Sequence, residues 1–103
     1  MRLTAEEAAA GPADGALRPD WRPALVRSVL LRHDRVRGVD LLVLPERVVV
    51  LRGSAGSIVE LCDGEREVGV IVEELERRNP GSAAVAEDVP RFLAALRAEG
   101  WLR

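Results

Sequence analysis

The sequence is poor in cysteine and contains no lysine. Its 103 residues include one cysteine, Cys62, and all fifteen basic residues are arginine, which we attribute to GC-rich codon usage. A single cysteine excludes an intramolecular disulfide and a cysteine-cluster metal site. Because Cys62 falls on an apolar helical stripe, we expect it to be a core residue in a reducing compartment.

Long apolar runs and catalytic motifs are also missing. The chain has no apolar run of about 18 residues and no basic start followed by a hydrophobic segment, so we expect a cytoplasmic protein. A chain of this length forms one domain with little room for a large internal cavity. His33 has only Asp34 beside it in sequence, so we interpret it as a solvated histidine at a strand end.

Charge is distributed unevenly along the chain. Residues 21–53 carry seven arginines and three acids, whereas residues 54–103 carry six arginines and ten acids. An anionic partner should therefore prefer the first of these regions.

The stretch from Val39 to Cys62 organises the chain. Two apolar runs, 39–44 and 48–51, flank the turn at Pro45-Glu46-Arg47 and predict a hairpin. An earlier run, 26–33, predicts the first strand. Tight hairpin turns often need a glycine with positive φ, so Arg47 predicts either local strain of about 1 kcal/mol or another turn geometry.

Three helices are expected after the strands. Apolar residues at helical spacing begin at Ala55, Val68 and Val89, and the third helix should start near Glu87. Ser54 is the expected N-cap of the first helix, and Pro90 should lie in the first turn of the third. The fold class is therefore α+β, a winged helix-turn-helix-like arrangement of a three-stranded antiparallel sheet followed by three helices.

Four segments resemble the PqqD family of pyrroloquinoline quinone biosynthesis. The pattern R-x-D-x-V-R occurs at 32–37, and the following segments match the family at 41–55, 58–68 and 88–102. The chain departs from the family pattern at Arg47 for a turn glycine, Arg52 for an asparagine and Glu67 for a Ser or Thr. The resemblance covers about four-fifths of the chain. We therefore expect a flexible tail over residues 1–22 and a PqqD-like peptide-binding domain over residues 23–103, with Trp21 either anchored on the core or exposed in the tail.

The resemblance implies a RiPP recognition element, which binds a peptide and has no catalytic site of its own. In that family the protein holds the precursor peptide PqqA and presents it to the radical SAM enzyme PqqE, which links a glutamate to a tyrosine in the peptide. The iron–sulfur clusters and S-adenosylmethionine belong to that enzyme, so we expect no cofactor or metal here.

The resemblance also implies that the peptide lies as an extra strand along the third strand and over the third helix. A valine-rich edge strand is independently suited to strand addition. The expected peptide-binding residues are Arg47, Val48, Val49, Val50, Leu51, Arg52, Asp88, Arg91 and Ala95. A proline at Val49 is expected to remove an edge donor, and the open edge leaves a monomer or a homodimer possible.

Three alternatives stand beside this interpretation. The same scaffold could serve another precursor peptide, from mycofactocin or an unassigned pathway. A DNA-binding winged helix is disfavoured because Glu87, Asp88 and Glu99 would oppose phosphate on the third helix. A stand-alone enzyme has no motif to support it.

Overall fold

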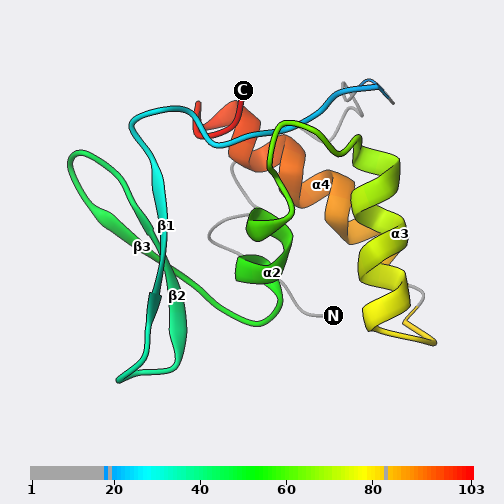
Figure 1. Cartoon of the computed structure of the whole chain (residues 1–103), viewed down its shortest axis with the longest axis horizontal. Helices are drawn as coiled ribbons and strands as arrows, with labels where there is room; N and C mark the ends of the chain where they lie inside the picture. The colour runs from blue at the N-terminus through cyan, green and yellow to red at the C-terminus, as the bar shows by residue number, and fades with distance from the viewer. Residues whose placement is uncertain (1–17, 19, 83) are drawn as a thin grey trace.

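The chain folds into a small sheet followed by three helices, as predicted (Figure 1). The computed structural model describes residues 18, 20–82 and 84–103, so most of the expected tail lies outside the described residues. The elements are β1 (Leu30–Asp34), β2 (Val39–Val43), β3 (Val48–Leu51), α2 (Ala55–Glu60), α3 (Val68–Arg78) and α4 (Val85–Ala98). None of the helices in these ranges is long and apolar enough to cross a membrane.

The strands form an antiparallel sheet in the order β1-β2-β3. The second and third strands lie where the sequence predicted them, but the first begins at Leu30 and not at Val26. The C-terminal residues explain this difference, because Leu25 bridges to Leu102 and the Val26 N–H donates to the carbonyl of Trp101 at 3.0 Å. The residues just before β1 are therefore held by the chain end and are not available to the sheet.

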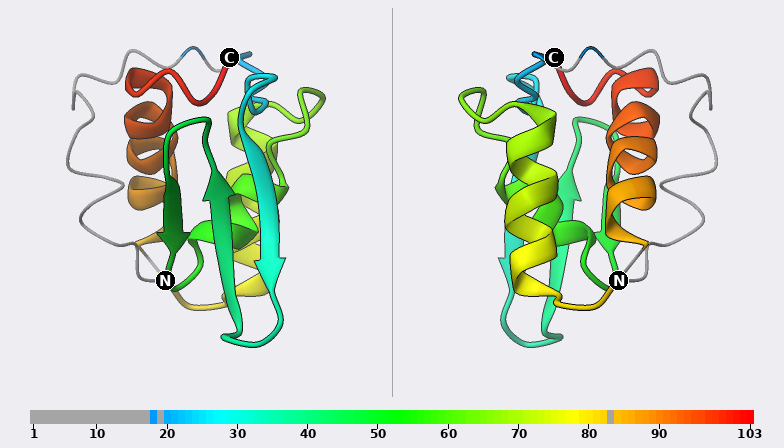
Figure 2. Two further views of the ribbon diagram at one scale, coloured as in Figure 1. Left: turned by 90° about the vertical axis from the view of Figure 1, so that its left-hand side faces the viewer. Right: turned by 90° about the vertical axis from the view of Figure 1, so that its right-hand side faces the viewer.

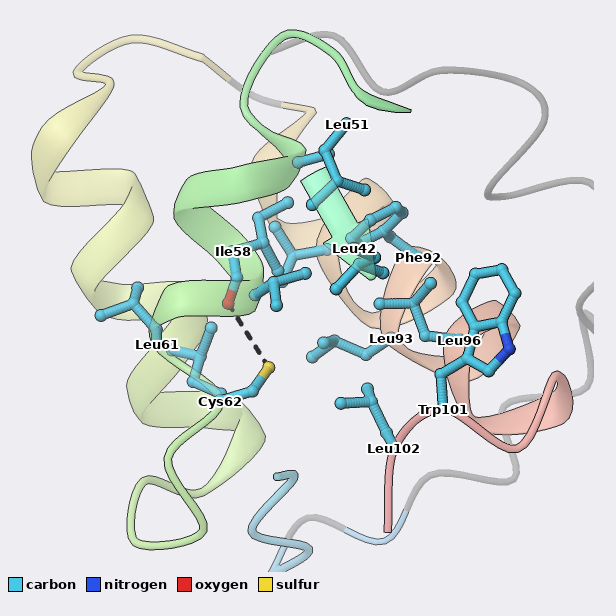
Figure 3. Close-up of a cluster of buried hydrophobic side chains, with 14 of the residues drawn as sticks. Leu42, Leu51, Ile58, Leu61, Cys62, Phe92, Leu93, Leu96, Trp101 and Leu102 are labelled. Carbon is cyan, nitrogen blue, oxygen red and sulfur yellow. Dashed lines mark hydrogen bonds between the residues drawn. The ribbon is translucent and has the colours of Figure 1, made fainter. Parts of the chain in front are cut away.

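The helices lie on one side of the sheet and leave its other side uncovered by any described helix (Figures 1 and 2). The helix α4 lies on the β3 side of the molecule, and α3 lies behind β1 and β2 (Figure 2). The core forms between the sheet and the helices. Figure 3 shows Leu42 and Leu51 from the sheet beside Ile58 of α2 and Phe92 of α4, all of them buried.

Two helix starts differ from the prediction. Ser54 occupies the N-cap position of α2, but its side chain makes no capping hydrogen bond. The helix α4 starts at Val85, two residues earlier than expected, because Val85 is fully buried and packs in the core. Pro90 consequently lies in the second turn, where the carbonyl of Ala86 loses its usual helical donor. Ala86 is exposed, so water can satisfy that carbonyl.

Trp21 is anchored on the domain, which decides between the two interpretations of this residue. Its Nε1–H donates to the carbonyl of Arg103 at 3.1 Å, and its own carbonyl accepts the N–H of Val68 at 3.1 Å. The guanidinium of Arg97 lies 4.7 Å from the centre of the Trp21 ring. The segment entering the domain is thus fastened to the start of α3 and to the chain end.

Replacing Leu42 by alanine tests which face of the sheet is the core. Leu42 is fully buried, so we expect Leu42→Ala to lower the free energy of unfolding by about 2–5 kcal/mol. Leu30 on the neighbouring strand is 48% exposed, and Leu30→Ala should cost less than about 1 kcal/mol. Urea unfolding of both variants measures the difference, and equal losses would contradict the assigned faces.

Candidate functional site

The outer edge of β3 is open within the part of the chain that the structure describes. There β3 pairs on one side only, with β2, in the register that places Val49 opposite Leu42 and Val48 opposite Val43. The chain therefore contains an edge strand at the position where the sequence predicted one.

The register fixes which backbone groups of β3 are free. The Leu44 N–H donates to the Arg47 carbonyl at 2.9 Å, and hydrogen-bonded pairs alternate along an antiparallel ladder. Val49 and Leu51 therefore bond to β2, whereas the N–H and C=O of Val48 and Val50 point to the open edge. The expectation that a proline at Val49 removes an edge donor is consequently wrong, because the Val49 N–H faces β2.

The side chains of β3 alternate between the core and the solvent. Val49 and Leu51 are buried against the helices, Val48 is 54% exposed and Val50 is partly exposed. This is the alternation that a strand with one face in the core shows. A strand added along the edge would therefore bond to the backbone of Val48 and Val50 and pass beside their exposed side chains.

Three exposed arginines belong to the expected site. Arg47 and Arg52 lie just before and just after β3, and Arg91 lies on α4. Among the described residues none of these three forms an ion pair. By contrast, Arg66 bonds to Asp63 at 2.7 Å. The three guanidinium groups can therefore accept an acidic partner without breaking an existing ion pair.

The sequence predicted either a strained backbone at Arg47 or a turn geometry without strain, and the structure has the turn without strain. Within the described ranges every positive φ belongs to a glycine, so Arg47 is not strained. Its guanidinium lies 5.4 Å from the centre of the Trp101 ring, a cation–π contact. The Trp101 ring restricts the Arg47 side chain just before β3. The turn sequence alone did not indicate this contact.

The expected residues of α4 have different surroundings. Asp88 is partly exposed and Arg91 is exposed, but Ala95 is fully buried. The side chain of Ala95 therefore offers no surface to a partner in this conformation and packs in the core. Helical spacing placed Ala95 near Arg91, but it could not show how closely the neighbouring elements cover it.

His33 has a partner that its neighbours in sequence did not reveal. Its Nδ1 lies 2.8 Å from Oδ1 of Asp40, directly across the β1–β2 pair. Asp40 also packs against Gly56 of α2, where an added Cβ would lie 1.8 Å from the Asp40 Oδ2. The register of the hairpin is the signal that identifies this pair, because it places residues 33 and 40 opposite each other.

Cys62 is buried, as predicted, and its thiol donates to the Ile58 carbonyl at 3.4 Å (Figure 3). Burial, together with the nearby charge of Asp63, raises the pKa of Cys62 to about 12. The thiolate is therefore scarce near neutral pH, and a nucleophilic role for this residue is disfavoured.

Comparison with known proteins identifies what the chain is similar to. The sequence model of the family described as "Coenzyme PQQ synthesis protein D (PqqD)" matches residues 27–102. A "PqqA binding protein" of Pseudomonas entomophila (strain L48) is 36% identical over 84 residues, covering 82% of this chain and 88% of that protein. A protein of the same name from Pseudomonas fluorescens (strain Pf-5) is 35% identical over 89 residues, covering 86% and 93%.

A solved structure has the same fold. The solution NMR structure of the PqqD truncation of Methylobacterium extorquens PqqCD matches with a TM-score of 0.71 and 31% identity. The match covers 86% of this chain and 96% of that one. That truncation is described as a functional, stand-alone recognition element for ribosomally synthesized and post-translationally modified peptides.

The surroundings of Cys62 predict slow alkylation. Iodoacetamide reacts with the thiolate, so we expect labelling of the folded protein at pH 8 to be at least about 100-fold slower than in denaturant, because burial and the raised pKa act together. Mass spectrometry of timed samples measures both rates. Equal rates would show that the thiol is accessible in the folded chain.

Proposed function

Because the chain belongs to the PqqD family, we propose that it binds a PqqA-like precursor peptide as an added strand along β3. We propose further that it presents this peptide to a radical SAM enzyme of the PqqE type. The names of its relatives and the recognition element of similar fold support the peptide as partner. Within this proposal the chain is a carrier, and the chemistry belongs to the enzyme.

The observation that carries the proposal is the open edge of β3. Val48 and Val50 together offer two N–H donors and two C=O acceptors to an incoming strand. Four hydrogen bonds at a net value of about 1 kcal/mol each supply about 4 kcal/mol, whereas micromolar affinity needs about 8 kcal/mol. Side-chain contacts must therefore provide about half of the binding free energy.

Arginines at both ends of β3 can supply part of this remainder. Arg47 and Arg52 are five positions apart, on the order of 17 Å along an extended strand. Each can form charge-assisted hydrogen bonds with a carboxylate of the peptide, and Arg91 of α4 is a third candidate. Since the Trp101 ring already restricts Arg47, less side-chain entropy is lost when this residue binds. Asp88 is the acidic member of the proposed site.

The precursor peptide of another pathway is the alternative partner. Arg47 and Arg52 replace residues that the family pattern has at the two ends of the edge strand, where they can change the choice of peptide. A radical SAM gene beside a gene for a short Glu-x-x-x-Tyr peptide would favour the PqqA-like partner. The acidic first turn of α4, with Glu87 and Asp88, disfavours DNA in either case.

Proline substitutions at adjacent valines test strand addition. Val48→Pro removes an outward-facing donor at the first residue of β3, where proline is tolerated. We expect peptide affinity, measured by calorimetry, to fall at least about tenfold, because one hydrogen bond is lost and the proline ring crowds the incoming strand. The free energy of unfolding should change by less than about 1 kcal/mol.

Val49→Pro is the matched control, with the same substitution one residue along the strand. It removes a hydrogen bond to β2 inside the sheet, so we expect a loss of about 3 kcal/mol or more in stability. Wild-type affinity in a folded Val48→Pro protein would exclude this edge as the binding site.

Charge reversal at the end of β3 tests the arginine contacts. We expect Arg52→Glu to weaken binding of an acidic precursor peptide at least about fivefold and to reduce its salt dependence, because one charge-assisted contact becomes repulsive. Arg27→Glu is the control, since Arg27 is also exposed and forms no ion pair with any described residue, but it precedes β1. Equal effects of the two substitutions would indicate a general charge effect and not a contact at the site.

A further inference from the structure

The side of the sheet that faces away from the helices is largely apolar. The β-pairing places Leu30, Val43 and Val48 in one row across the three strands, and Leu41 and Val50 in the next row. We name this surface the outer face, and its apolar members are Leu30, Val39, Leu41, Val43, Val48 and Val50. Leu30 is 48% exposed and Val48 is 54% exposed, and the other four are partly exposed.

An antiparallel sheet with one face in the core usually has polar side chains on the other face. Here the core takes Leu42, Val49 and Leu51, and the outer face is nevertheless also apolar. No described helix covers it (Figure 2, left). Contiguous exposed apolar patches of this kind mark interaction sites.

Basic residues lie within the outer face and at one end of it. Arg32 lies within it, opposite Leu41, and Arg35 and Arg37 lie in the hairpin between β1 and β2. At the other end of the sheet Glu46 is exposed, and the guanidinium of Arg47 is turned to the Trp101 ring on the helix side. The outer face is therefore an apolar surface with two exposed arginines, Arg32 and Arg35, that form no ion pair with a described residue.

The basic hairpin has a defined shape. Asp34 Oδ1 accepts the backbone N–H of Val36 at 3.0 Å and of Arg37 at 3.2 Å, and its Oδ2 lies 3.9 Å from the Arg37 Nε, so the carboxylate holds the turn and pairs with Arg37. Val36 is 96% exposed at the tip of this turn. The hairpin thus presents an apolar side chain between two arginines, next to the outer face.

We propose that the outer face is the docking surface for the enzyme that acts on the bound peptide. This inference rests on the proposed function. The docked surface of the enzyme would have apolar side chains together with carboxylates that meet Arg32 and Arg35 of this chain. A peptide added to β3 extends the same sheet, so half of its side chains lie on the same side as the outer face. Peptide and enzyme would therefore meet at a shared boundary along β3.

Charge and composition disfavour two other occupants. A second copy of the chain, packed outer face to outer face around a twofold axis, would bring the arginines of the two copies close together. Residues 1–17 contain only three large apolar side chains, Met1, Leu3 and Leu17, which are too few to cover the six apolar residues of the face. An enzyme surface with apolar side chains and carboxylates would match both the apolar residues and the arginines of the outer face.

A glutamate on the far strand of the sheet tests the proposal. Leu30 lies on β1, across the sheet from the edge of β3, so Leu30→Glu should leave peptide affinity within about twofold of wild type. Affinity for a PqqE-type radical SAM enzyme, measured by calorimetry, should fall at least about tenfold because a charge enters the apolar centre. Arg32→Glu should have the same effect, because it reverses the charge within the outer face.

Val70→Glu is the matched control, because Val70 is 45% exposed on α3, away from the sheet. It should change neither affinity, and amide spectra of all variants should show a folded domain. Wild-type enzyme affinity in both Leu30→Glu and Arg32→Glu would overturn the proposal, as would an equal loss in Val70→Glu. So would a dimer, seen by ultracentrifugation, that Leu30→Glu dissociates while enzyme affinity stays unchanged.

The peptide titration separates this inference from the proposed function. If the wild-type chain fails to bind the precursor peptide, the proposed function fails, whereas the enzyme titration still reports on the outer face. If the peptide binds but Leu30→Glu and Arg32→Glu both leave the enzyme affinity unchanged, the proposed docking surface is wrong and the proposed function stands.

Discussion

The register between β2 and β3 determines which side chains and backbone groups of β3 are exposed. The hydrogen bond from Leu44 to Arg47 sets the order of the ladder, which turns the backbone of Val49 inward and that of Val48 and Val50 outward. The same register sends Leu42 and Leu51 into the core. A shift by one residue would exchange both the buried side chains and the free backbone groups.

The chain end holds this arrangement in place. Val26 bonds to Trp101 before the sheet begins, and Trp101 also lies beside Arg47 at the turn before β3. Trp21 bonds to Arg103 and to the start of α3. Contacts of this kind connect residues far apart in sequence, and they position the open edge relative to α4. The edge is therefore supported by the whole domain and not by the hairpin alone.

The sequence predicted the features that depend on local periodicity. The hairpin of β2 and β3, the apolar stripes of the three helices and the buried Cys62 follow from spacing, and the structure has them. The resemblance to the PqqD family was also correct. These predictions succeed because burying one face of a helix or strand places apolar residues at a regular spacing in the sequence.

Long-range contacts account for what the sequence could not predict. The start of β1 depends on the C-terminal residues, the His33–Asp40 pair depends on the hairpin register, and the burial of Ala95 depends on the elements packed around α4. The backbone direction at Val49 likewise follows only from the pairing with β2.

Hydrogen exchange at single amides tests the central claim most directly. In the free protein the amides of Val49 and Leu51 should exchange slowly, because they bond to β2, and those of Val48 and Val50 should exchange fast. Precursor peptide should slow exchange at Val48 and Val50 and leave Val49 and Leu51 nearly unchanged. Slow exchange at Val48 and Val50 without peptide, or no slowing with it, would contradict strand addition at this edge.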